Sequence, residues 1–121
     1  MDFETGIRAR VFKDYEASDP NPLVIKAGEK LWVGDTDTTW PAFVRCRNAA
    51  ANEGWVPDIY LNSDGNDGVA LVDYSAVELT VSSGEIIFLE EEVGGWYWAR
   101  TETGARGWIP AEHVSKPKPE T

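Results

Sequence analysis

The chain has 121 residues and a formal net charge of −10, from 21 acidic and 11 basic side chains. This charge disfavours contact with the phosphate backbone of nucleic acids and favours basic partners. One cysteine and one histidine exclude an intramolecular disulfide and a zinc site built from the usual ligands, and no apolar run has the length of a membrane-spanning helix. The first residues lack the basic and then apolar pattern of a signal peptide, so we expect a cytoplasmic protein.

The first half of the sequence predicts short β-strands separated by turns. Alternating side chains at 7–12 indicate a strand, and Pro20 and Pro22 exclude a central strand in the loop that follows. Pro57–Tyr60 suits one turn of 3₁₀ helix, and Leu61 closes the segment. The other expected strands of this half are 23–25, 30–34, 40–47 and 55–56.

The second half predicts the same series of elements. A polar, glycine-containing linker is expected at 62–67, and the tail at 116–121 is expected to be disordered or extended. The expected strands of this half are 68–72, 79–81, 85–90, 96–101 and 105–109.

The two halves are copies of one another. Asp14-Tyr15 recurs as Asp73-Tyr74, and Gly54-Trp55-Val56-Pro57 recurs as Gly107-Trp108-Ile109-Pro110. The distance between copies falls from 59 to 56 to 53 residues along the chain, which indicates two deletions of three residues in the second copy. Loops tolerate such deletions, whereas a helix would be rotated off its packed face. The sequence therefore predicts an all-β chain made of two small modules.

The order of these motifs resembles that of SH3 domains, in the variant style of bacterial proteins. In the second copy, Ala70-Leu71-Val72-Asp73-Tyr74 is similar to the Ala-Leu-Tyr-Asp-Tyr motif of the family, and Trp96-Tyr97-Trp98-Ala99 is similar to Trp-Trp-x-Ala. Gly107-Trp108-Ile109-Pro110 is similar to the Gly-Tyr-Ile-Pro motif. The resemblance implies two five-stranded SH3-like barrels in tandem, at 7–61 and 68–115.

SH3 domains bind proline-rich peptides in the polyproline II conformation between aromatic rings, next to acidic loops that meet a basic flank of the ligand. Carried over by position, the resemblance implies a groove in each module. In the first module the implied residues are Tyr15, Trp40, Pro57 and Tyr60, with Glu16, Asp19, Asp35 and Asp37 as acids. In the second they are Tyr74, Trp96, Pro110 and His113, with Glu78, Glu90, Glu91 and Glu92 as acids.

Both modules depart from the family pattern. The first groove tyrosine of the family is replaced by Lys13 in one copy and by Val72 in the other, and His113 stands where the family has a tyrosine. The loop between Tyr74 and Leu79 is also shorter than its counterpart between Tyr15 and Leu23. We therefore expect any peptide recognition to differ between the two modules.

Strand alternation predicts the core residues Leu31, Val33, Val56, Ile87, Leu89, Ala99 and Ile109.

Three aromatic side chains are expected to face away from the cores. Trp32 lies between two core positions, Phe88 is its counterpart in the second copy, and Trp98 shares a strand face with Trp96. Exposed aromatic rings at matched positions suggest an apolar surface that packs between the modules or in a homodimer.

Three functions are open at this point. The first is a non-enzymatic scaffold that binds a proline-rich or basic peptide, with neither membrane nor nucleic acid as partner. The second is an assembly unit with degraded grooves, and the third is an aromatic cage for methylated lysine. The sequence shows no catalytic residue set, no metal-ligand set and no cofactor motif, so we expect none of these.

Overall fold

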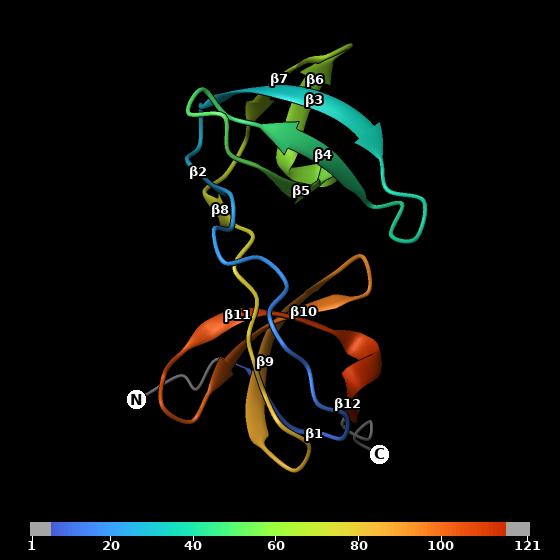
Figure 1. Ribbon diagram of the computed structural model, residues 1–121, viewed down its shortest axis with the longest axis vertical. Coiled ribbons are helices and arrows are strands. Elements are labelled where there is room, and N and C mark those ends of the chain that lie inside the picture. Colours follow the sequence, from blue (N-terminus) through green and yellow to red (C-terminus); the bar gives the residue numbers. More distant parts are fainter. Residues whose placement is uncertain (1–5, 116–121) are drawn as a thin grey trace. The chain divides into compact units, whose positions relative to one another are not determined.

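The structure is a computed structural model and describes residues 6–115 (Figure 1). The tail that we expected to be disordered, 116–121, lies outside the described residues. Within 6–115 the secondary structure consists of β-strands and two 3₁₀ turns, with no α-helix, in agreement with the predicted all-β class. No helix in this range is long and apolar enough to cross a membrane.

The described part of the chain forms twelve short strands. They are β1 (Ile7–Val11), β2 (Val24–Ile25), β3 (Lys30–Thr36), β4 (Phe43–Arg47), β5 (Glu53–Pro57), β6 (Leu61–Asp64), β7 (Asp67–Ala70), β8 (Tyr74–Ser75), β9 (Ile86–Val93), β10 (Trp96–Thr101), β11 (Arg106–Pro110) and β12 (Val114–Ser115). The 3₁₀ turns are η1 (Asp58–Tyr60), as expected after Pro57, and η2 (Ala111–His113).

The chain divides into two compact units that differ from the expected division at 62–67. Unit 2 is continuous and comprises Asp19–Val77. Unit 1 is discontinuous and comprises Met1–Ser18 together with Glu78–Thr121. Unit 2 is thus inserted into the sequence of unit 1 between Ser18 and Glu78, instead of following it.

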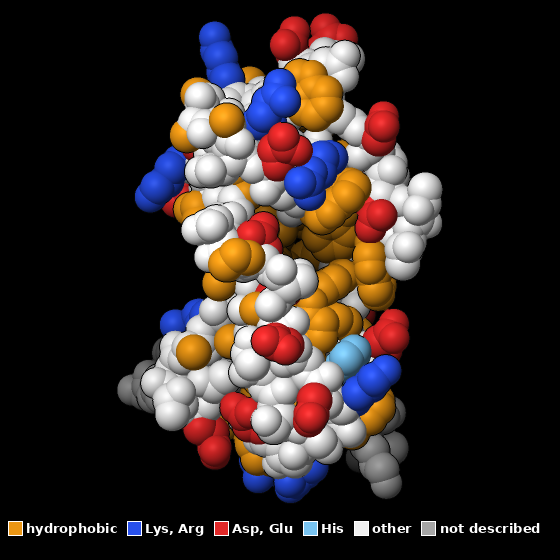
Figure 2. Space-filling model, viewed as in Figure 1, with side chains coloured by type: hydrophobic (Ala, Val, Ile, Leu, Met, Phe, Trp, Pro, Cys, Tyr) orange, Lys and Arg blue, Asp and Glu red, His pale blue; other side chains and the backbone are white. Residues whose placement is uncertain are grey.

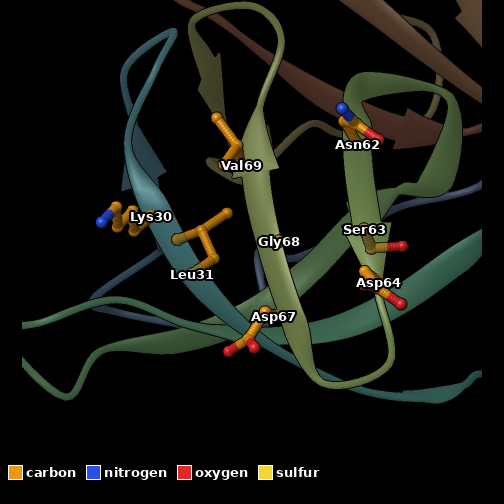
Figure 3. A pocket seen from close by; sticks show the side chains of 8 residues that line it. All are labelled: Lys30, Leu31, Asn62, Ser63, Asp64, Asp67, Gly68 and Val69. Carbon is orange, nitrogen blue, oxygen red and sulfur yellow. The ribbon is translucent and has the colours of Figure 1, made fainter.

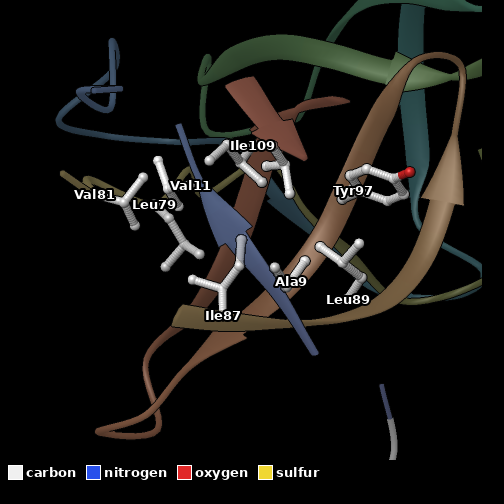
Figure 4. Packing of buried hydrophobic residues seen from close by; sticks show 10 residues of the cluster. Ala9, Val11, Leu79, Val81, Ile87, Leu89, Tyr97 and Ile109 are labelled. Carbon is white, nitrogen blue, oxygen red and sulfur yellow. The ribbon is translucent and has the colours of Figure 1, made fainter. Parts of the chain in front are cut away.

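Unit 1 is built around a five-stranded antiparallel sheet in the order β11-β10-β9-β1-β12 (Figure 1). The N-terminal strand β1 pairs with β9 on one side and with β12 on the other. Ala9 and Val11 of β1 point into the core beside Ile87 and Leu79 (Figure 4). A strand from the first copy of the repeat therefore completes the core of the second.

Unit 2 has the equivalent order, β5-β4-β3-β7-β6, with a separate pair of short strands, β2 and β8. Here β7, from the second copy, pairs with β3 of the first copy. The two orders match position by position: β11, β10, β9 and β12 are the second-copy counterparts of β5, β4, β3 and β6. At the fourth position, however, unit 1 has β1 of the first copy and unit 2 has β7 of the second copy. The first strand of each copy is thus part of the sheet formed by the other copy.

The segment expected as a linker, 62–67, is instead part of a β-hairpin. Residues Asn62–Asp64 belong to β6, Asp67 begins β7, and Asp64 is paired with Asp67. Gly65 has a φ of 62°, which suits the first position of a tight hairpin turn where glycine is preferred. The Asn66 side chain also donates a hydrogen bond to the Val33 carbonyl oxygen at 2.8 Å. A polar, glycine-containing segment is equally typical of a linker and of such a turn, which is why we expected a linker.

The core residues predicted from strand alternation are buried, which confirms that part of the prediction. They are Leu31, Val33, Val56, Ile87, Leu89, Ala99 and Ile109. Cys46, on β4, has no exposed surface, and its burial raises the pKa of the thiol to about 11.

Candidate functional site

The motif tyrosine of the first copy, Tyr15, is placed in unit 1. Its backbone forms an isolated antiparallel bridge with Val81: each amide donates to the carbonyl oxygen of the other, at 3.0 Å from Tyr15 and 2.8 Å from Val81. Because β1 ends at Val11 and pairs with β9, the chain that follows it runs along unit 1 as far as Ser18. This pairing fixes the position of the Tyr15 ring.

Three rings gather at this point in unit 1. The centroid of the Tyr15 ring lies 6.0 Å from that of Trp96 and 5.1 Å from that of His113, with interplanar angles of 81° and 82°. Edge-to-face contacts at these distances are favourable arrangements of aromatic rings. Trp96 begins β10 and His113 ends η2, so strand, turn and N-terminal segment each contribute one ring.

His113 is fixed by the backbone of the N-terminal segment. Its Nδ1 lies 3.1 Å from the carbonyl oxygen of Asp14 and 3.3 Å from that of Lys13. Carbonyl oxygens only accept hydrogen bonds, so Nδ1 carries the proton and donates it. The other ring nitrogen, Nε2, is then the one that a ligand could address. Figure 2 shows this side chain in pale blue at the surface, next to hydrophobic side chains.

Glu78 accepts hydrogen bonds both from Tyr15 and from Ser18, the residue after which unit 2 is inserted. Its Oε1 accepts hydrogen bonds from the Tyr15 hydroxyl at 2.8 Å, from the Ser18 amide at 2.9 Å and from the Ser18 hydroxyl at 3.0 Å. Burial and this carboxylate together raise the pKa of the Tyr15 hydroxyl well above its usual range. Glu78, which we predicted as a ligand-binding acid, therefore also has a structural role, because its hydrogen bonds fix the end of the N-terminal segment.

Unit 2 brings together two other predicted tyrosines. The ring centroids of Tyr60 and Tyr74 are 5.7 Å apart, and the Tyr74 hydroxyl donates to the Trp55 carbonyl oxygen at 3.0 Å. Pro22 stands at the position that Glu78 has in the other copy, so this unit offers no carboxylate there. Tyr74 is buried, whereas Tyr15 is half-buried, so the two sites are chemically unequal.

The groupings inferred from the resemblance are therefore corrected by the strand exchange. Tyr15 lies with Trp96 and His113 rather than in one unit with Trp40, Pro57 and Tyr60, and Tyr74 lies in the unit of Tyr60 rather than in that of Trp96. The cause is the pairing of β1 with β9 and of β7 with β3, which carries each tyrosine into the unit of the other copy.

The remaining predicted site residues occupy a range of environments. Pro57 and Pro110 are buried at the ends of β5 and β11, and Trp40 is half-buried. Asp19 accepts a hydrogen bond from the Asn21 amide at 2.8 Å, which stabilises the proline-containing loop. Exposed positions are taken by Glu16, Asp35, Glu91 and Glu92, while Asp37 is half-buried. Glu91 and Glu92 are paired with Trp98 and Tyr97 across the β9–β10 hairpin that leads to Trp96.

The three aromatic residues expected to face outward contact side chains of their own units. The guanidinium carbon of Arg47 lies 4.9 Å from the Trp32 ring centroid, and that of Arg100 lies 4.7 Å from the Phe88 ring centroid. Trp98 packs against Trp108 at 5.3 Å between centroids. Sequence reasoning missed these arginines, although an Arg directly across the strand pair from Trp32 and from Phe88 is a readable signal.

A shallow depression of about 480 Å³ lies on the sheet of unit 2 (Figure 3). It is lined by side chains of β3, β6 and β7, among them Lys30, Asn62 and Asp67. None of the predicted site residues lines it. Over residues 6–115, no group of three or more histidine, cysteine, aspartate or glutamate side chains is placed to hold a metal ion.

In a comparison with known protein families, residues 66–116 match the variant SH3 domain. Comparisons with curated proteins and with solved structures returned no significant match. The family match supports an SH3-like fold for this part of the chain, and SH3-type domains are in general protein-interaction modules. Its first residues, 66–77, belong to unit 2, and the rest of its described part belongs to unit 1.

Proposed function

We propose that this chain binds an extended peptide, proline-rich and with a basic flank, on the surface of unit 1 formed by Tyr15, Trp96 and His113. The observation that carries the proposal is the gathering of these three rings, at 5.1 and 6.0 Å, from three separate segments. Polyproline II helices dock in grooves that are lined by aromatic rings.

The polar groups around the rings support a basic ligand. The net charge of the chain is −10, and acidic side chains are spread over the visible surface in Figure 2. Glu91 and Glu92 lie on the strand that turns into Trp96 and are exposed. A ligand with arginine or lysine beside its prolines would therefore be drawn to this unit and oriented along it.

His113 adds a polar contact for the ligand. Because Nδ1 donates to the Asp14 carbonyl oxygen, a neutral ring presents Nε2 as an acceptor, and a peptide amide of the ligand is a suitable donor. In this respect His113 differs from the tyrosine of the family pattern, whose hydroxyl donates. The preferred ligand should thus differ from that of an SH3 domain with tyrosine at this position.

The test is a calorimetric and NMR titration of the full chain with a proline-rich peptide that carries a flanking arginine. We expect saturable binding, with the largest shift changes at the indole of Trp96, and a loss of affinity of about tenfold or more in Trp96→Ala. Trp55→Ala is the matched control, because Trp55 lies in unit 2 and stacks under Arg45.

Two results would contradict the proposal. One is equal affinity of Trp96→Ala and the unchanged chain; the other is unchanged binding when alanine replaces the prolines of the peptide. A concentration-dependent mass without any peptide binding would favour an assembly unit instead.

A further inference from the structure

The exchanged strands make the same backbone hydrogen bonds in the two units. In unit 1 the Val11 amide donates to the Glu85 carbonyl oxygen at 2.9 Å. In unit 2 the Ala70 amide donates to the Glu29 carbonyl oxygen at the same 2.9 Å. These four residues are counterparts in the repeat, so each strand has the hydrogen bond that it would have within its own copy.

The side-chain bond at the next turn is duplicated as well. The Ser83 amide donates to Asp14 Oδ1 at 2.7 Å, and the Ala27 amide donates to Asp73 Oδ1 at 2.8 Å. Asp14 and Asp73 are counterparts in the two copies. Neither the backbone bonds nor these carboxylates can therefore decide which strand completes which unit.

Gly68 provides a difference that can decide it. A Cβ atom placed on Gly68 would lie 2.5 Å from Cγ2 of Val33, well inside van der Waals contact. Val33 is buried, with 6% of its surface exposed, and its branched side chain has little rotamer freedom. In unit 2, this strand position therefore accepts glycine and resists any larger residue.

Ala9 occupies the same register position in unit 1. Ala9 is paired with Ile87, and Gly68 is paired with Leu31, the counterpart of Ile87. The Ala9 side chain is buried in the core of unit 1. In the alternative arrangement, β1 would pair with β3 and β7 would pair with β9. Ala9 would then face Val33, while Gly68 would leave a space of methyl size in unit 1.

We propose that Gly68 is a positioning residue for the tyrosine of the unit 1 surface. Because the position against Val33 accepts only glycine, Gly68 directs 67–74 into unit 2, so that 7–15 completes unit 1 and Tyr15 joins Trp96 and His113. The strand assignment is independent of any ligand; only its consequence for peptide recognition depends on the proposed function.

The experiment uses disulfide formation to identify the partner of β1 in the full chain. In a Cys46→Ala background, one variant carries Arg10→Cys with Ile86→Cys, which are paired in unit 1. The other carries Arg10→Cys with Lys30→Cys, since Lys30 is the counterpart of Ile86 in the first copy. Only the disulfide formed within one chain is counted, after separation of monomer from dimer.

With the native residues at positions 9 and 68, we expect the variant with cysteines at 10 and 86 to form much more intramolecular disulfide than the variant with cysteines at 10 and 30. The ratio of these two yields is the measured quantity. Exchange of the two small residues, Ala9→Gly with Gly68→Ala, should shift the ratio toward the disulfide between positions 10 and 30 by about tenfold, as the removal of one steric overlap implies. The control is Ala99→Gly alone, which removes a methyl group from a buried alanine of β10 and leaves residues 9 and 68 unchanged, and it should not shift the ratio.

A dominant disulfide between positions 10 and 30 with the native strands would overturn the proposal, and so would an unchanged ratio in the exchanged variant. If that variant fails to fold, the fit of Gly68 against Val33 is tested by measuring the stability of Gly68→Ala. This substitution should destabilise the chain, and Val33→Ala should restore part of the loss by making room for the added methyl group. No destabilisation by Gly68→Ala, or no recovery, would overturn the proposal. No peptide is involved, so a failed titration leaves these outcomes unaffected.

Discussion

The hydroxyl of Tyr15 donates a 2.8 Å hydrogen bond to Oε1 of Glu78, a residue from the other copy of the repeat. The same oxygen accepts two hydrogen bonds from Ser18, the last residue of unit 1 before the insertion of unit 2. The bond thus joins the two segments of unit 1, one ending at Ser18 and the other beginning at Glu78.

Loss of this hydroxyl should destabilise unit 1. We expect Tyr15→Phe to lower the free energy of unfolding by about 1.5–3 kcal/mol, since the acceptor is a carboxylate. Tyr74→Phe is the control: its hydroxyl donates to a neutral carbonyl oxygen, so the loss should be about 1 kcal/mol. Urea denaturation followed by NMR signals of each unit measures both, and a larger loss in the control would contradict the expectation.

The raised pKa of Tyr15 predicts a loss of stability in alkali. Its folded pKa lies above the unfolded value of about 10, so the unfolded chain ionises first as the pH increases. The contribution of Tyr15 to stability is therefore complete below about pH 10 and declines above it. In a spectrophotometric titration, we expect Tyr15 to resist ionisation until the chain unfolds, and Tyr15→Phe to remove that signal. Ionisation of all tyrosines in the folded chain near pH 10 would refute this.

Glu90 of unit 1 should contribute more to stability than Glu53 of unit 2. Glu90 lies 3.4 Å from Arg100 and 3.0 Å from Arg106, and only 12% of its side chain is exposed. Glu53 contacts Arg45 and Arg47, but 41% of its side chain is exposed. We expect the less exposed Glu90–Arg100 contact to make Glu90→Gln cost about 1–2 kcal/mol, and Glu53→Gln to cost less than about 0.5 kcal/mol.

Thermal denaturation in low and high salt would measure these two substitutions. The loss in Glu90→Gln should persist in high salt better than that in Glu53→Gln, because partly buried charges are screened less. Equal losses for the two substitutions would show that the difference in exposure has no consequence.

The hairpin at 64–67 predicts a cost for a side chain at Gly65. With φ at 62°, Gly65→Ala should destabilise the chain by about 1 kcal/mol, since L-residues are disfavoured in this conformation. Ser63→Ala, an exposed position on β6 next to the turn, should have little effect. Denaturant unfolding measures both, and a neutral Gly65→Ala would indicate the flexible linker that the sequence suggested.

Much of the fold could be predicted from the sequence because its signals are local. The alternation of apolar side chains placed Leu31, Val33, Ile87 and Leu89 in the cores, and proline marked the 3₁₀ turn at Asp58–Tyr60. The candidate site was predicted in part. Trp96 and His113 do lie together with a tyrosine, but that tyrosine is Tyr15 rather than Tyr74.

By itself, the sequence determined most of the strands, their inward faces and the motif order of an SH3-like module, since each depends on residues close together along the chain. It did not predict β6, and at 79–81, where we expected a strand, the structure has only an isolated bridge at Val81. Only the tertiary structure decided which copy each first strand completes. The two copies share the same motifs and hydrogen-bonding groups, so either pairing satisfies the local pattern. The choice depends on the fit of single side chains across the sheets, such as Gly68 against Val33 and Tyr15 against Glu78.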